Sequence, residues 1–554
     1  MPLADPRVRR WRAWALWPAL LLCGFLPGCR QPASPPPGSR RLAIVAVDGA
    51  TWRVISPMME KGELPRLSGL YRRGSAGLLR SVEPMLPAAL WTTVATGMSR
   101  GTHGIERASE RIPGRYTARP LTADRRRVPA LWSIAGARGL TVGVSGWDLT
   151  FPAEQVNGYL IAQAYEPGVT GDHGYLHPQG ALGETAGVDE RLRLSDAAQR
   201  VAALDGETRA SFDRDLAALS CGLTLYRVYQ PRLAFFRFSS IDLVSHRFWQ
   251  YHEPRYLELA ASRGVAIDAR RAADLAAALP GAYAVFDEWL GLLLERLPAG
   301  STILLISDHG FRGVDMTDYL HVDLNWLLER LGFLTFGGGQ EPDWKRTQAF
   351  TLDDVGGMRR PIYLNLKGRE EQGLVDPAGA VGLKLKLAET LRGLESHLGG
   401  PLFRTVTVDD APGPGEPDLT VVENMAIDPH GEVLLGDRRQ SVASLYRRYG
   451  EDFGAHDPEG MLLAAGDGIV VGRTGWTADL QDVAPTVLRL MGLPAASDMP
   501  GRIIVAILQG SGAGSEGALV PTYTDLPPAP SPMKRPAALA DEELRRLRAL
   551  GHLR

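Results

Sequence analysis

Two residues with metal-binding side chains follow a short apolar run in the middle of the chain. Residues 303–306 are apolar, and the pair Asp308 and His309 stands two residues further on. A run this short is typical of a strand buried on both faces of a parallel sheet, and in open α/β sheets ligand sites lie beyond the carboxyl ends of the strands. A carboxylate oxygen beside an imidazole nitrogen suits zinc or manganese. The same pattern also fits an ordinary turn that binds no metal.

The start of the folded part of the chain repeats this arrangement. Residues 42–47 are apolar and are followed by Asp48 and Gly49, which places Asp48 at the end of a second buried strand. Further on, Pro87 precedes the mostly apolar sequence AALWTTVA. Proline is well placed as the first residue of a helix because the N–H that it lacks would be unpaired there. The N-terminus of a helix is in turn a favourable place for an anion.

These segments, in this order, resemble the alkaline phosphatase superfamily. The apolar strand with its Asp-Gly end, the proline-rich turn into WTTVATG at residues 91–97 and HGI at residues 103–105 are most similar to its type I phosphodiesterase/nucleotide pyrophosphatase branch. The resemblance spans about residues 41–502. It implies an α/β fold with a mostly parallel central sheet flanked by helices. It is weakest over residues 106–227, where it implies an inserted cap region.

The resemblance also implies a set of metal ligands, and suitable residues occur in the order of the family. The segment FFRFSSID at residues 235–242 is expected to be a strand that ends on Asp242, and His246 comes four residues later, on the same face if a helical turn begins there. His456 stands in a turn before the apolar residues 461–463. Two cations, zinc or alternatively manganese, would be about 4 Å apart and stabilise both oxygens of a displacement at phosphorus. By resemblance, one cation is held by Asp48, Asp308 and His309, and the other by Asp242, His246 and His456.

The chain departs from the family at the nucleophile. Family hydrolases carry Thr or Ser at the N-terminus of the helix after Asp48, and this position falls on Pro87, which has no nucleophilic atom. Thr92 is the candidate that we retain as a catalytic hydroxyl, although it lies more than a helical turn further along. The expected function is metal-dependent hydrolysis of phosphate esters, of the phosphodiesterase or phosphatase type. The alternative is a metal-binding pseudoenzyme or a ligand-binding envelope protein.

The first 29 residues have the features of a bacterial lipoprotein signal peptide. Four arginines lie within residues 7–12, an apolar stretch too short to span a bilayer follows at residues 13–25, and LPGC ends at Cys29. This ending resembles a lipobox, which implies lipidation of Cys29; a plain secretory signal is the alternative. Residues 30–40 form a tether rich in proline and serine. We therefore expect a protein anchored in the bacterial cell envelope, on the periplasmic or cell-surface side.

The composition of the chain favours a large globular enzyme over a nucleic-acid-binding protein. The 554 residues are 45% hydrophobic and 22% charged, with a formal net charge of -2. This balance gives no electrostatic reason to expect nucleic acid as a partner. The expected partners are a phosphorylated small-molecule or lipid substrate and, through the anchor, the membrane. We predict one metallohydrolase domain over residues 41–510 and a tail rich in Gly, Ser and Pro over residues 511–554, with a short helix near its end.

Overall fold

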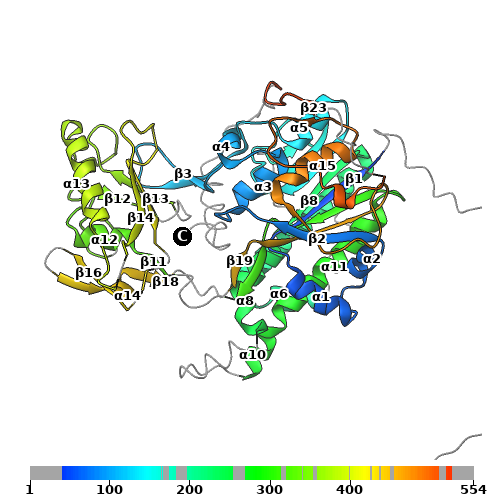
Figure 1. Ribbon diagram of the computed structural model, residues 1–554, viewed down its shortest axis with the longest axis horizontal. Helices are drawn as coiled ribbons and strands as arrows, with labels where there is room; N and C mark the ends of the chain where they lie inside the picture. The colour runs from blue at the N-terminus through cyan, green and yellow to red at the C-terminus, as the bar shows by residue number, and fades with distance from the viewer. Residues whose placement is uncertain are drawn as a thin grey trace, which may run out of the picture. The chain divides into compact units, whose positions relative to one another are not determined.

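The computed structural model describes most of the chain beyond the predicted signal and tether (Figure 1). The described residues are 40–163, 165, 174–181, 196–253, 269–313, 320–339, 341–352, 359–398, 400–424, 427–428, 430–435, 438–448, 454–510 and 519–526. The predicted signal peptide with Cys29, nearly all of the tether and the predicted helix near the C-terminus lie outside these residues.

A nine-stranded, mostly parallel sheet forms the centre of the fold. Its strand order is β21-β2-β20-β9-β1-β8-β5-β6-β7. Strands β9, β1, β8, β5 and β6 run parallel to one another, whereas β20 and β7 are antiparallel to their neighbours. This confirms the predicted fold class. The strands are β1 (Leu42–Val47), β2 (Gly74–Arg80), β5 (Val142–Trp147), β6 (Gly158–Ala162), β7 (Leu176–His177), β8 (Leu233–Phe238), β9 (Thr302–Ile306), β20 (Glu459–Ala465) and β21 (Trp476–Asp479).

Helices cover both faces of the sheet because its middle strands are apolar on both faces. In β1, Ile44 and Ala46 belong to one apolar cluster, and Val45 and Val47 belong to another. Alternation along a strand sends successive side chains to opposite faces, so each cluster is the core of one face. The first face carries α3 (Pro87–Thr96), α5 (Leu131–Ala137) and α15 (Val483–Leu490). The second carries α1 (Trp52–Glu60), α2 (Pro65–Arg72), α7 (Gly206–Tyr229), α8 (Ser240–His252) and α11 (Ala278–Arg296).

Residues 320–448 form a separate lobe with a core of its own. Its sheet has the order β12-β13-β15-β14 and packs with α12 and α13 around an apolar cluster that includes Phe350, Ile362 and Leu387. The chain enters through β11 (Leu320–Val322), which pairs with β18 (Tyr446–Arg448) at the exit. Its other elements are α12 (Leu324–Arg330), β12 (Ala349–Phe350), β13 (Arg359–Leu364), α13 (Ala380–Arg392), β14 (Phe403–Val408), β15 (Leu419–Glu423), β16 (Glu432–Leu435), β17 (Arg438–Ser441) and α14 (Val442–Leu445).

The place of the insertion differs from the prediction. Most of residues 106–227, where we expected a cap, belong to the central sheet and its helices, since β5, β6, β7, α5 and α7 all come from this range. The separate lobe instead follows β10 (Gly310–Gly313) and ends before β19 (Gly454–Asp457), and these two strands pair with each other.

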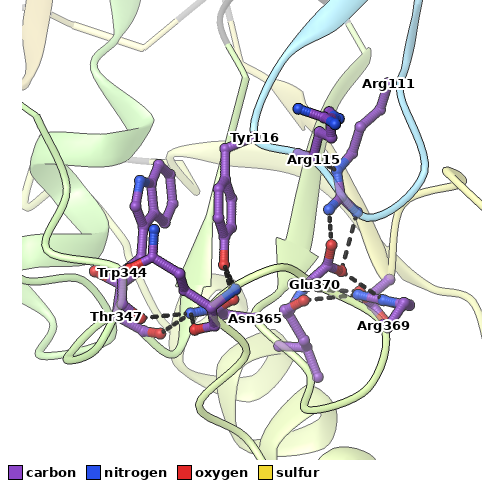
Figure 2. A network of polar contacts seen from close by, with 11 residues as sticks. Arg111, Arg115, Tyr116, Trp344, Thr347, Asn365, Arg369 and Glu370 are labelled. Atoms are coloured by element: carbon purple, nitrogen blue, oxygen red, sulfur yellow. Dashed lines mark hydrogen bonds and ion pairs between the residues drawn. The ribbon is translucent and has the colours of Figure 1, made fainter.

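One hairpin of residues 106–227 does leave the sheet and contacts the lobe. It consists of β3 (Ser109–Arg111) and β4 (Ala118–Pro120). Between the strands, the Tyr116 ring stacks on Trp344, with 3.7 Å between ring centroids, and its hydroxyl donates to Asn365 Oδ1 over 2.7 Å. Arg111 forms a buried ion pair with Glu370 (Figure 2). These contacts attach the hairpin to the lobe.

Candidate metal centre

Three neighbouring strands deliver acidic residues to one edge of the central sheet. Asp48 directly follows β1, and Asp308 and His309 lie just past the end of β9, which pairs with β1 on one side. On the other side β1 pairs with β8, after which the chain enters α8, whose first turn carries Asp242. Because the strands are parallel, their carboxyl ends meet at the same edge. His246 follows one helical turn after Asp242, and β19 adds His456.

Asp242 lies at the centre of this cluster. Its Oδ1 atom is 3.7 Å from His246 Nε2, 3.5 Å from His456 Nε2 and 3.8 Å from His309 Nε2. Five of the six predicted ligands fall into two groups whose ligand atoms lie within 4.8 Å of one another: Asp242, His246 and His456 in one, and Asp48, Asp242 and His309 in the other. The resemblance assigned Asp242 to a single cation, whereas the structure places it in both groups.

Asp308 lies beside the second group without belonging to it. Its Oδ2 atom is 3.6 Å from His309 Nε2. The residue is fully buried, and neither of its carboxylate oxygens has a hydrogen-bond partner within the described part of the chain. The same holds for Asp48 Oδ1, which lies 3.4 Å from His309 Nε2. Buried carboxylate oxygens without donors are costly. A cation at this place would satisfy them, so the donor set fits a divalent metal.

Backbone carbonyls fix the orientation of the three histidine rings through their outer nitrogens. The Nδ1–H of His246 donates to Gly454 O over 3.1 Å, and that of His456 donates to Met85 O over 3.0 Å. His309 Nδ1 is 3.0 Å from Gly310 O. A carbonyl oxygen only accepts, so each Nδ1 carries a proton, and Nε2 is the ring nitrogen that each histidine directs at the cluster. This backbone support of the outer nitrogen is common in metal sites.

The buried acids and His309 shift one another's pKa values. Burial alone would raise the pKa of Asp48, but the charges of Arg237 and His309 more than offset this and lower it. Burial and the charge of Asp48 raise the pKa of Asp308. Burial would lower the pKa of His309, but the neighbouring carboxylates raise it to about 10. The raised values of Asp308 and His309 both follow from the negative charge buried in the cluster.

Two positioning residues of the site were not predicted from the sequence. Arg237 of β8 forms a buried ion pair with Asp48 Oδ2, to which Trp91 Nε1 also donates over 3.3 Å. Asp215 of α7 accepts from the backbone N–H groups of Ser239 and Ser240, over 2.8 and 2.7 Å, and so caps the start of α8. A signal for Arg237 was present, since an arginine in an otherwise apolar buried strand requires an acidic partner.

The predicted catalytic Thr92 is directed into its own helix. Its Oγ1 donates to Ala88 O over 2.6 Å, and the side chain is buried in α3. Pro87 is the first residue of α3, as predicted. The side chain that reaches the carboxylates from this helix is Trp91, through Asp48. The geometry therefore gives Thr92 no support as a nucleophile.

The fold is a mostly parallel α/β sheet with an Asp and His cluster at its carboxyl edge, the arrangement expected for the alkaline phosphatase superfamily. The sequence matches the model of the type I phosphodiesterase / nucleotide pyrophosphatase family over residues 42–410, about two thirds of its length, and the chain belongs to this family. No curated protein matches the sequence. Among solved structures, it is similar to phosphonoacetate hydrolase from Sinorhizobium meliloti 1021, crystallised with phosphonoformate. That match has 14% identity and a TM-score of 0.42, and covers 83% of this chain and 97% of the other.

Proposed function

We propose that the protein is a metal-dependent hydrolase of phosphate esters that uses two divalent cations. The observation that carries this proposal is the arrangement of His246, His309 and His456, whose Nε2 atoms all face the Oδ1 atom of Asp242. Family membership supports the reaction class. The mixture of carboxylate and imidazole donors favours zinc, with manganese as the alternative.

Each half of the cluster would hold one cation. His246 and His456 would bind the first, and Asp48, Asp308 and His309 the second, with Asp242 between them. Such a pair of cations supplies charge stabilisation for the attacking and leaving oxygens of an in-line displacement at phosphorus. Pro87 offers no atom that could form a phospho-enzyme, so we propose that water attacks the substrate in a single step. Arg237 and Trp91 hold the Asp48 carboxylate in place meanwhile.

Hydrolysis of bis- and mono-4-nitrophenyl phosphate tests this function. Protein stripped with EDTA and reloaded with zinc or manganese should hydrolyse at least one of the two esters. Asp308→Asn should abolish turnover, whereas Asp479→Asn should not, because Asp479 is an exposed acid paired with Arg80. Metal-loaded wild-type protein that hydrolyses neither ester would contradict the proposal.

One observation favours a second function, that of a metal-binding pseudoenzyme. The first residue of α3 is a proline, and the hydroxyl of Thr92 is bonded to the helix backbone. A protein that binds two cations with the expected stoichiometry and cleaves no ester would fit this alternative.

We further propose that the protein acts in the bacterial cell envelope, anchored through a lipid on Cys29. The support is the signal-like sequence before Cys29 and the proline-rich tether behind it. Two acyl chains are sufficient for stable anchoring, at about 0.8 kcal/mol per buried methylene group. The substrate would then be a phosphorylated small molecule or a lipid available there. If wild-type protein and Cys29→Ala are equally soluble on cell fractionation, the anchor is excluded.

A further inference from the structure

Arg237 is a charged residue in the middle of the apolar sheet. It belongs to β8, whose residues are all buried, and pairs with Ala46 of β1, two positions before Asp48. Its side chain is 2% exposed. A buried arginine is retained only when a partner compensates its lost hydration.

The partner of Arg237 is a predicted metal ligand. One guanidinium nitrogen pairs with Asp48 Oδ2, and the guanidinium carbon lies 5.5 Å from the centre of the Trp91 ring. Its Nε–H has no hydrogen-bond acceptor among the residues that the structure describes. The surroundings of Arg237 therefore compensate its charge more fully than they satisfy its N–H donors.

From this geometry we infer that Arg237 is a built-in counter-ion, which stabilises the metal-free site and weakens metal binding at Asp48. The inference rests on the proposed two-metal site. Three buried acidic side chains, those of Asp48, Asp242 and Asp308, converge there, and without cations negative charge on them is unfavourable. The guanidinium offsets part of this charge.

Metal binding reverses the effect of Arg237. Two divalent cations carry more positive charge than the three carboxylates balance, so the guanidinium then adds to an excess of positive charge. Like charges a few ångströms apart in a buried site repel strongly. Removal of the arginine should therefore cost stability in the metal-free protein and increase the affinity for metal, because the two effects are linked.

Thermal unfolding and zinc titration of three variants test this inference. In EDTA, Arg237→Met should unfold well below the wild-type protein, and saturating zinc should remove most of the difference. Calorimetric titrations with a competing chelator measure the affinity for each of the two zinc ions. For the zinc ion that is bound less tightly, the affinity of this variant should be at least about ten-fold higher than that of the wild type. Arg237→Lys retains the charge and should bind zinc as the wild type does. Should Arg237→Met fold in neither buffer, Arg237→Gln replaces it with the same expected direction.

Arg360→Met is the matched control. Arg360 is an equally buried arginine, 2.9 Å from Glu423 in the separate lobe. Its loss should lower the unfolding temperature equally with and without zinc. If Arg237→Met behaves in the same way, or binds zinc more weakly than the wild type, the counter-ion role is wrong. It is also wrong if Arg237→Lys follows Arg237→Met. Failure of wild-type protein to bind zinc would overturn the two-metal site itself, and this inference with it.

Discussion

The Nε2 atoms of His246 and His456 lie 3.0 Å apart. Because both rings donate their Nδ1 protons to backbone carbonyls, the two atoms that face each other carry lone pairs. Lone pairs at this distance repel unless a proton or a cation lies between them. With Asp242 Oδ1 within 3.7 Å of both, a cation is the occupant best suited to this place.

Substitution of single ligands should separate the two metal positions. His456→Ala removes a ligand of one group only, so the purified variant should retain roughly half of its metal. Asp242→Asn changes a ligand that both groups share and should lower the affinity for both cations. Metal analysis after dialysis against a weak chelator measures both effects. Equal metal loss in the two variants would contradict the central place of Asp242.

Hydrolysis of phosphate esters should not require the hydroxyl of Thr92. Since its hydroxyl donates to Ala88 O, Thr92→Ala should retain most of the hydrolytic activity. Pro87→Thr should raise the rate, because it places a hydroxyl at the start of α3. The change also adds a backbone N–H at the first helical position, where N–H groups have no partner within the helix. Phosphorylation of Thr92 during turnover, detected by mass spectrometry, would show instead that Thr92 is the nucleophile.

Acid should destabilise the protein through His103. Burial lowers the pKa of His103 to about 3, while its Nδ1 accepts the N–H of Ile105 over 3.1 Å. The unfolded chain takes up a proton near pH 6.5, so stability is lost as the pH falls from about 6.5 towards 3, by up to about 1.4 kcal/mol per pH unit. Urea unfolding at several pH values should show a shallower acid slope for His103→Gln than for wild type. Identical slopes would exclude this residue as the cause.

Loss of the hairpin contacts should release β3 and β4 from the lobe. Tyr116→Ala removes both the stacking on Trp344 and the hydrogen bond to Asn365, and we expect a loss of about 2 kcal/mol in the free energy of unfolding. Tyr116→Phe keeps the ring and should lose less. Limited proteolysis should cut Tyr116→Ala within residues 109–120 faster than it cuts wild type. If Phe and Ala substitutions cost the same, stacking contributes nothing.

The elements that carry the site were predictable because their signals are local. The apolar runs before Asp48 and Asp308 form β1 and β9, and Pro87 begins α3. Burial on both faces requires a continuous apolar run, and a helix start tolerates proline, so each pattern has one physical cause. The family and fold class follow from the order of these segments.

Contacts between distant segments were not predictable in the same way. That Arg237 binds Asp48, or that Asp215 caps α8, depends on which strands and helices become neighbours. The lobe of residues 320–448 was missed because its sheet forms by pairing of strands that are distant in sequence, such as β13 with β15. The shared position of Asp242 likewise depends on side-chain geometry.

The strand order has a consequence for folding. Asp48 and His456 come from opposite ends of the folded chain, and β20, which follows His456, inserts between β2 and β9 rather than at an edge. The sheet is therefore completed by one of its last-made strands. Pairings of such high contact order form slowly, since a long loop must close first. Capture of the cation by His456 should thus be a late event, and the rate of zinc uptake by refolding protein would report the completion of the whole sheet.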